Sequence, residues 1–204
     1  MKKKIILFLI IVLIIFCIIF IKNNYKNFKK GNNINIKSAD KITEYILNIE
    51  NYEAEATITV QSNKTTNKYK VKQKYKKENN VYEQEVLEPE NIKGLTITYD
   101  GKNLEVKNTK LNLSKIYENY MYVGSNDLSL TSFIEEFKEN EGKTYEDNGN
   151  VIMETSVKNG NKYRANKKLY INKKSEKITK LEVQDINKNT LIYILYNEIE
   201  LNNN

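Results

Sequence analysis

The chain has 204 residues, a formal net charge of +7, no histidine, no tryptophan and one cysteine, Cys17. Without histidine it cannot form a Ser-His-Asp triad, a Cys-His pair or a His-ligated zinc site, and we expect neither a metal nor a cofactor. Residues 1–37 hold eight lysines and no acid, whereas residues 38–204 hold 25 basic and 26 acidic side chains. The positive charge therefore lies outside the part expected to fold, which argues against nucleic-acid binding.

The N-terminus carries an apolar segment that predicts a membrane anchor. Three lysines at 2–4 precede an unbroken apolar run that starts at Ile5 and ends at Ile21. As a helix the run is roughly 26 Å long at about 1.5 Å per residue, close to the thickness of a bilayer core. We expect residues 1–21 to form a single transmembrane helix that leaves the rest of the chain outside the cytoplasm, in a Gram-positive cell envelope.

Two other interpretations of this segment were weighed. A cleaved signal peptide needs small residues after the apolar run, and residues 22–25 read Lys-Asn-Asn-Tyr. A lipoprotein signal would use Cys17, but Phe16 stands where a small residue is expected. An uncleaved anchor explains the segment best, with cleavage or lipidation at Cys17 left open.

Residues 22–37 are polar and read as a linker, and residues 38–204 as one domain. Ser38 can cap a helix over about 39–50. The helical stripe that supports it comprises Ile42, Tyr45, Ile46 and Ile49.

The segment after this helix alternates apolar and polar residues, which is typical of strands with one buried face. Asp100-Gly101 predicts a hairpin turn, and residues 111–122 are less periodic. The predicted strands cover about 52–61, 68–75, 81–87, 95–99 and 104–108. Lysines alternate along the second of them, which indicates the solvated face of an antiparallel sheet or, alternatively, a surface for an acidic partner.

A second helix and a second group of strands follow. Asn126 or Asp127 can cap the helix, whose apolar stripe comprises Leu130, Phe133, Ile134 and Phe137. Four further strands are predicted at about 151–157, 168–172, 177–184 and 190–196. Strands and helices do not alternate, so the expected class is α+β, mainly β: a strongly curved antiparallel open half-barrel sheet with two helices packed on its concave side.

Catalytic chemistry would have to rest on carboxylates, lysines or tyrosines, because thiol and imidazole groups are missing from the predicted domain. The candidate carboxylate pairs are Glu83 with Glu85, Glu88 with Glu90, and Glu135 with Glu136. The first pair reads as the solvated face of a strand, and the last as neighbours that point in different directions on a helix. We expect no catalytic site and no enzyme.

Residues 88–104 carry a resemblance to a known fold: they read Glu-Pro-Glu-Asn-Ile-Lys-Gly-Leu-Thr-Ile-Thr-Tyr-Asp-Gly-Lys-Asn-Leu. The order of strand, proline, glycine, apolar strand, Tyr-Asp-Gly and strand resembles the LolA-type family, an open half-barrel shared by bacterial lipoprotein carriers and related envelope proteins. The membrane-tethered form looks most like the GerS group of clostridial spore germination proteins. That resemblance implies a spore-envelope protein that partners a cell-wall amidase acting on cortex peptidoglycan.

Three functions remain open at this point. The first is a non-catalytic adaptor for a cell-wall (spore cortex) amidase. The second is a lipid or lipoprotein carrier, and the third an envelope-stress sensor; a homodimer through the open sheet is compatible with each. A carrier would need an apolar cavity on the concave face. Its lining would come from residues that otherwise form an ordinary core: Ile58, Val60, Tyr69, Val71 and Phe133.

Overall fold

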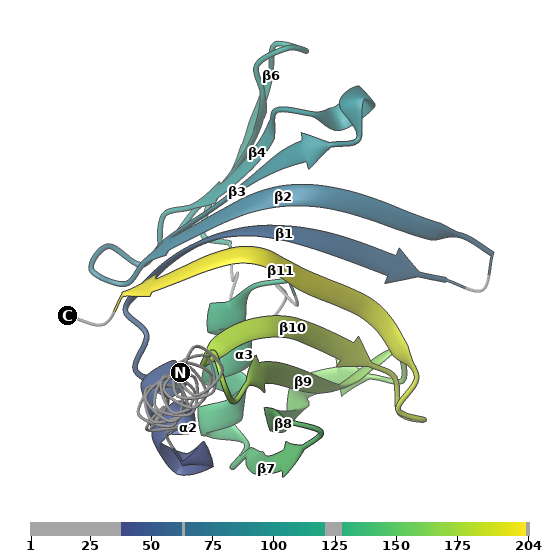
Figure 1. Cartoon of the computed structure of the whole chain (residues 1–204). Helices are drawn as coiled ribbons and strands as arrows, with labels where there is room; N and C mark the ends of the chain where they lie inside the picture. The colour runs from purple at the N-terminus through teal and green to yellow at the C-terminus, as the bar shows by residue number, and fades with distance from the viewer. Residues whose placement is uncertain (1–37, 63, 121–127, 203–204) are drawn as a thin grey trace, which may run out of the picture. The chain divides into compact units, whose positions relative to one another are not determined.

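Apolar–polar alternation along the chain produces one long antiparallel sheet. The computed structural model describes residues 38–62, 64–120 and 128–202, and Lys37–Asn204 form one compact unit. Within the described residues the sheet has eleven strands, in the order β6-β5-β4-β3-β2-β1-β11-β10-β9-β8-β7 (Figure 1). Each half is a meander in chain order, and the two halves meet where β1 pairs with β11.

The first half of the unit comprises helix α2 and six strands. Their bounds are α2 Ala39–Leu47, β1 Asn51–Gln61, β2 Thr66–Lys76, β3 Val81–Glu88, the 3-10 turn η1 Glu90–Ile92, β4 Leu95–Tyr99, β5 Leu104–Asn108 and β6 Leu113–Tyr117. The second half comprises helix α3 and five strands. Their bounds are α3 Leu130–Glu139, β7 Lys143–Asp147, β8 Asn150–Asn161, β9 Arg164–Asn172, β10 Lys177–Gln184 and β11 Thr190–Asn202.

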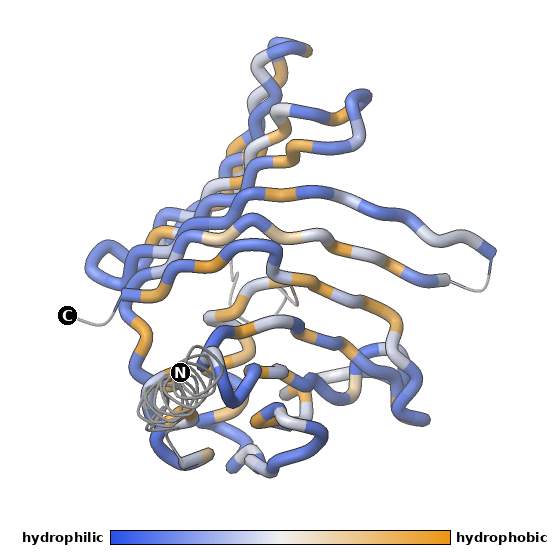
Figure 2. Tube along the Cα trace, in the orientation of Figure 1, coloured by the Kyte–Doolittle hydropathy of each residue, from blue (hydrophilic) through white to orange (hydrophobic). Residues whose placement is uncertain are grey.

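The core lies between the curved sheet and the two helices. Hydrophobic and hydrophilic positions alternate along the central strands (Figure 2), and the buried set of β1 includes Tyr52, Ala56 and Ile58. From the helices, Ile46 and Phe133 are fully buried in the same apolar cluster. The strand period of two places one set of side chains inward and the other in solvent, so the sequence pattern itself selects the face that α2 and α3 cover.

Most of the predicted elements are confirmed. Ser38 caps α2 through a hydrogen bond that its Oγ accepts from the Lys41 backbone amide at 3.4 Å. Asp100 and Gly101 form the turn of the β4–β5 hairpin, in which Asp100 Oδ1 accepts from the Asn103 amide. The open antiparallel sheet with two short helices is therefore as the alternation predicted.

The cap predicted for the second helix was wrong. Asn126 and Asp127 lie outside the described residues, and the cap is Ser129, whose Oγ accepts from the Thr131 amide at 3.2 Å. Ser129 directly precedes Leu130, the first residue of the helix, and its hydroxyl can accept from a free amide of the first turn. Asn126 and Asp127 are too far before the helix to do so.

Two strands were missed, and several were predicted too short, most of all β8, β9 and β11. All five β6 residues are exposed, and β7 is a short polar strand, so neither has the alternate burial by which strands are recognised. β8 and β9 extend beyond their predicted ends through mainly polar residues. β11 continues past the register shift at Asn197 through alternating residues that pair with β1, such as Ile199 opposite Ala54.

The predicted anchor between Ile5 and Ile21 and the linker at 22–37 lie outside the described residues. Across 38–62, 64–120 and 128–202 no helix has the length and apolar character needed to cross a membrane.

Candidate functional site

The five residues predicted for the concave face share that face. Ile58, Val71 and Phe133 are buried in the core, and Val60 and Tyr69 are partly buried and pack against it. Ile58 lies opposite Tyr69 in the β1–β2 ladder, and Val60 lies two residues further along the same face. The pattern therefore brought these side chains together, and the lipid-lining role considered for them stays a prediction.

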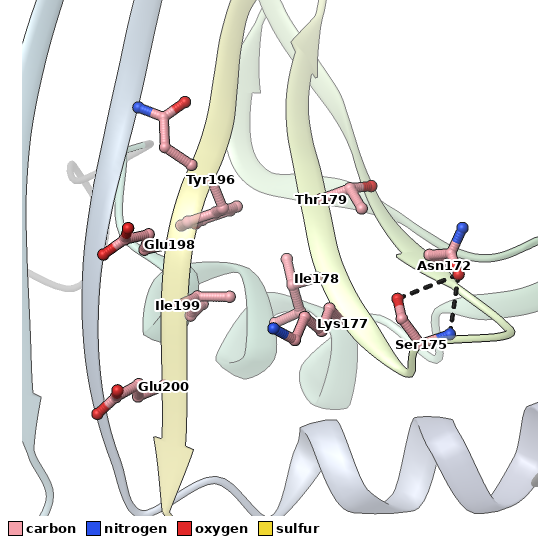
Figure 3. Close-up of a pocket in the computed structure, with 10 residues that line it drawn as sticks. Asn172, Ser175, Lys177, Ile178, Thr179, Tyr196, Glu198, Ile199 and Glu200 are labelled. Carbon is pink, nitrogen blue, oxygen red and sulfur yellow. Dashed lines mark hydrogen bonds between the residues drawn. The ribbon is translucent and has the colours of Figure 1, made fainter.

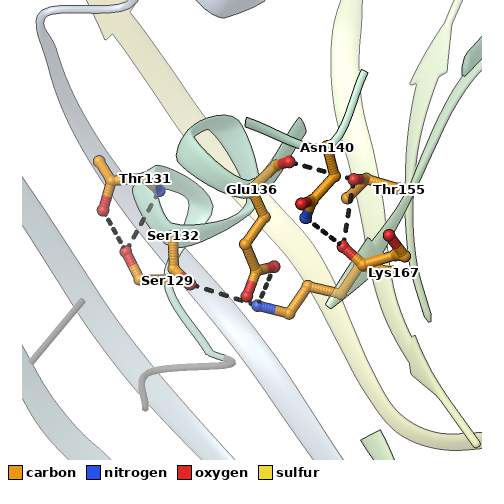
Figure 4. A network of polar contacts seen from close by, with 8 residues as sticks. Ser129, Thr131, Ser132, Glu136, Asn140, Thr155 and Lys167 are labelled. Carbon is orange, nitrogen blue, oxygen red and sulfur yellow. Dashed lines mark hydrogen bonds and ion pairs between the residues drawn. The ribbon is translucent and has the colours of Figure 1, made fainter. Parts of the chain in front are cut away.

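A buried ionic network fixes α3 to the second half of the sheet (Figure 4). Lys167 of β9 is 0% exposed, and its Nζ lies 2.8 Å from Glu136 Oε2 and 3.2 Å from Ser132 Oγ. On β8, Thr155 Oγ1 donates to the Glu136 carbonyl at 3.2 Å. A charge can be buried when it is paired and hydrogen-bonded, so these contacts set the position of the helix.

A second polar network holds the chain just before α3 against the first half of the sheet. Gln73 Nε2 donates to Gln84 Oε1 at 3.0 Å and to the Leu128 carbonyl at 3.1 Å. Tyr82 donates its hydroxyl proton to the same Gln84 oxygen at 3.0 Å. Both networks hold parts of this chain to each other, so they stabilise the packing of the chain around α3 against the sheet.

The carboxylate pairs named from the sequence do not converge on a reactive centre. Glu83 and Glu85 lie on β3 opposite Lys74 and Lys72 of β2. Glu136 is engaged with Lys167, and burial raises the pKa of its neighbour Glu135, with further contributions from Glu139 and Glu136. Among the described residues no group of three or more His, Cys, Asp or Glu could hold a metal ion.

The far edge of the first half of the sheet exposes apolar side chains. Among the described strands β6 pairs with β5 alone, and it lies at the end of the sheet away from α2 and α3 (Figure 1). Exposed fractions here are 59% for Leu111, 61% for Leu113, 60% for Ile116 and 41% for Tyr117. Ile116 pairs with Glu105 on the other face of the sheet, whereas Leu111, Leu113 and Tyr117 line one hollow, and we call these three residues the β6 edge surface.

A cavity of about 480 Å³ adjoins the β6 edge surface. Its apolar walls include Ile92, Leu95 and Val106, together with Leu113 and Tyr117 of the edge strand itself. An unpaired strand edge beside an apolar hollow is a feature of surfaces that bind other proteins. The sequence contained a signal for it, because four large apolar residues fall within 111–117 without the alternation of a half-buried strand.

A comparison with known protein families identifies the family of this chain. A family model described as sporulation protein YdcC-like matches residues 2–204. The chain belongs to the YdcC-like sporulation protein family. No curated protein matches the sequence of this YdcC-like chain.

One solved structure that is similar to the YdcC-like chain contains a lipoprotein in complex with an amidase. The structure of the CwlD amidase from Clostridioides difficile in complex with the GerS lipoprotein is similar to it, with 27% identity, coverage of 88% of this chain and 94% of that chain, and a TM-score of 0.52. The resemblance predicted from residues 88–104 is thereby confirmed.

Two more distant structures also match, and the first of them is similar in fold. A conserved protein from Thermus thermophilus is 11% identical, over 82% of this chain and 90% of that chain, with a TM-score of 0.51. A LolA superfamily protein from Nitrosomonas europaea is 12% identical, over 81% and 94% of the two chains, with a TM-score of 0.43.

Proposed function

We propose that this YdcC-like protein is a non-catalytic partner of a cell-wall amidase in the envelope of a sporulating bacterium, held at the membrane by its N-terminal apolar segment. The observation that carries the proposal is the similarity to GerS, which is 27% identical over most of both chains and was solved in complex with CwlD. The family match to sporulation proteins gives the same cellular setting.

The chemistry of the chain supports a binding role. The polypeptide has no histidine, its single cysteine lies in the apolar N-terminal run, and its carboxylate pairs are divided between separate parts of the fold. The buried networks at Lys167 and Gln73 hold the helices to the sheet. Such a protein contributes by positioning or stabilising another protein's active site.

The β6 edge surface is the contact that we assign to the amidase. Leu111, Leu113 and Tyr117, which line the same cavity, provide the apolar and aromatic anchors found at the centre of protein interfaces. The free backbone edge of β6 can accept a strand from the partner. Burying one apolar side chain of this kind contributes about 1–2 kcal/mol, so loss of two anchors should weaken binding by at least about tenfold.

The proposal is tested by capture from sporulating cells. The full chain with an affinity tag is expressed at its normal level, extracted in detergent and isolated, and proteins and lipids are quantified by mass spectrometry. We expect a cell-wall amidase at near-equimolar amounts. The double variant Leu111→Glu/Leu113→Glu should lose it, and the control Ile186→Glu, at an apolar residue 67% exposed in the β10–β11 turn, should retain it.

Stoichiometric lipid without amidase would contradict the adaptor function and favour a carrier. Equal amidase recovery with both variants would keep the adaptor function and contradict the assignment of the β6 edge surface. Recovery of neither amidase nor lipid would also contradict the proposed function.

A further inference from the structure

The sheet opens between β10 and β11 over part of their length. Their ladder runs from Gln184 opposite Thr190 to Lys180 opposite Leu195 and stops there. β10 nevertheless begins at Lys177, and β11 continues to Asn202 while pairing with β1 on its other side. We call the space between residues 177–179 and residues 196–200 the split.

Two β-bulges face each other where the strands separate. On β11, Tyr196 pairs with Ala56 and Glu198 with Glu55 of β1, so Asn197 is the extra residue. On β10, the register with β9 shifts between Ile178 and Lys180, so Thr179 is the extra residue. A bulge bends its strand and increases the local twist, and two bulges at one level turn the strands apart.

The side chains of the bulged residues stabilise the separation. Asn197 Nδ2 donates to Thr57 Oγ1 of β1 at 3.1 Å, and Thr179 Oγ1 donates to the Tyr170 carbonyl of β9 at 3.1 Å. Each residue is thus tied to the neighbour on the far side of its own strand. The split is specified by the sequence and is not a frayed end of the sheet.

A cavity of about 570 Å³ occupies the split. Figure 3 shows Ile178 on β10 and Ile199 on β11 reaching toward the space between the strands, with Tyr196 beside them. Both walls are strand edges whose backbone donors and acceptors are not used in a β10–β11 ladder at this level. Backbone N–H and C=O groups need partners, and an extended peptide supplies them by adding a strand.

The inner wall of the split includes the largely buried side chain of Tyr196. Tyr196 is 8% exposed, and its hydroxyl is buried with no hydrogen-bond partner among the described residues. Burial raises the pKa of Tyr196, so the hydroxyl stays neutral and can both donate and accept. The hydroxyl lies in the core near Tyr52, so Tyr196 contributes the rest of its side chain to the wall of the split.

The outer side of the split is acidic. Glu198 lies directly opposite Glu55, and Glu200 directly opposite Glu53, two like-charge pairs that destabilise the sheet unless they are compensated. Glu53 and Glu55 are compensated by lysines of β2, with Lys72 Nζ 2.5 Å from Glu53 Oε1. Glu198 and Glu200 have no ion pair among the described residues, and they line the split.

We propose that the split binds an extended segment of a partner protein that carries basic side chains at alternate positions. Its backbone pairs with the open edge of β11 at residues 196–200. Because side chains of a strand alternate between two faces, the basic ones meet Glu198 and Glu200 while those between them point inward toward Tyr196. The site lies on β10 and β11, at the other side of β1 from the β6 edge surface, and does not depend on the amidase proposal.

The experiment measures binding of a labelled synthetic peptide to the full chain in detergent micelles by fluorescence anisotropy. The probe is a short peptide in which lysine alternates with threonine. In one comparison peptide glutamate replaces lysine, and in the other proline replaces threonine. We expect saturable binding of the lysine–threonine peptide alone. We also expect slower backbone hydrogen exchange in fragments covering residues 196–200 when it is bound.

A matched pair of double variants tests whether the peptide binds at the split. Glu198→Gln/Glu200→Gln should weaken binding by about tenfold or more, the loss of two charge-assisted contacts. Glu83→Gln/Glu85→Gln removes the same charge from alternate positions of β3 and should leave binding unchanged. Lys177→Gln should strengthen binding, because Lys177 lines the β10 wall and repels a basic peptide.

Three results would overturn the proposal. The first is no saturable binding of the lysine–threonine peptide. The second is equal weakening by both double variants, which would indicate general surface attraction. The third is equal binding of the proline-containing peptide, in which every second backbone N–H is missing and the rings disfavour pairing in a sheet.

Discussion

The buried pair of Lys167 and Glu136 allows a quantitative prediction. The lysine side chain is fully buried and the glutamate side chain is 10% exposed, with 2.8 Å between Nζ and Oε2. Glu136→Leu removes this ion pair and leaves the Lys167 ammonium buried, with its Nζ 3.2 Å from the Ser132 hydroxyl. Removing one partner of a buried pair costs about 3–5 kcal/mol, because the remaining charge is uncompensated.

The double variant Glu136→Leu/Lys167→Met should recover most of that loss. Apolar side chains of similar volume avoid the desolvation of both charges, and such replacements are often neutral or stabilising. The two substitutions should therefore be strongly non-additive, as expected for residues in direct contact. Lys167→Met alone should cost less than Glu136→Leu, since Glu136 is nearer to solvent and its carboxylate can hydrate.

Urea unfolding of the full chain in micelles, followed by far-UV circular dichroism, measures these differences. With a slope of about 2 kcal/mol/M, a loss of about 4 kcal/mol lowers the midpoint by about 2 M. The control Lys72→Met removes an exposed partner of Glu53 and should leave the midpoint nearly unchanged. A Glu136→Leu midpoint within error of the wild type, or a double variant no better than Glu136→Leu, would refute the reasoning.

Three further predictions use the same unfolding assay. Tyr196→Phe should raise the stability of the peptide-free chain by about 1 kcal/mol, because it removes a buried hydroxyl without a partner; a lower midpoint would contradict this. Gly142→Ala should cost about 1–3 kcal/mol, since the added methyl group would collide with the buried Phe137 ring, and an unchanged midpoint would contradict it. Burial raises the pKa of Glu135, and the neighbouring charges of Glu139 and Glu136 raise it further. The ionised carboxylate therefore destabilises the folded chain at a pH above this raised pKa. Below about pH 4.3 the group is protonated in both the folded and the unfolded state, and it has no such effect. Glu135→Gln should therefore stabilise the chain at pH 7 and have no effect near pH 4, and equal effects at the two values would argue against it.

Strict alternation explains why so much of the sheet was predictable. Along β1 the buried positions Tyr52, Ala54, Ala56 and Ile58 recur at every second residue, and the helix stripe of α3 recurs at the helical spacing. Register then follows, because a one-residue slip would move this whole set into solvent. These local patterns are sufficient to give the class, the order of elements and the face that the helices cover.

The buried ionic pair could not be predicted from the same patterns. Lys167 stands in a run with Lys168, and lysines are abundant throughout the chain. Its burial depends on β9 passing behind α3 so that Glu136 meets it from a helix some thirty residues earlier in the chain. Only the tertiary arrangement distinguishes this lysine from its solvated neighbour, which is 17% exposed and pairs with Glu154.

The two surfaces proposed for partners lie where the alternation fails. β6 has no buried face, so its apolar residues gain nothing from folding and remain available to another protein. Thr179 and Asn197 each interrupt a ladder by one residue, and the resulting split leaves strand edges open in the middle of the sheet. An isolated domain under selection for stability alone would pair those edges and make β6 polar. Retaining both departures costs stability in the free protein, and a bound partner at each position would offset that cost.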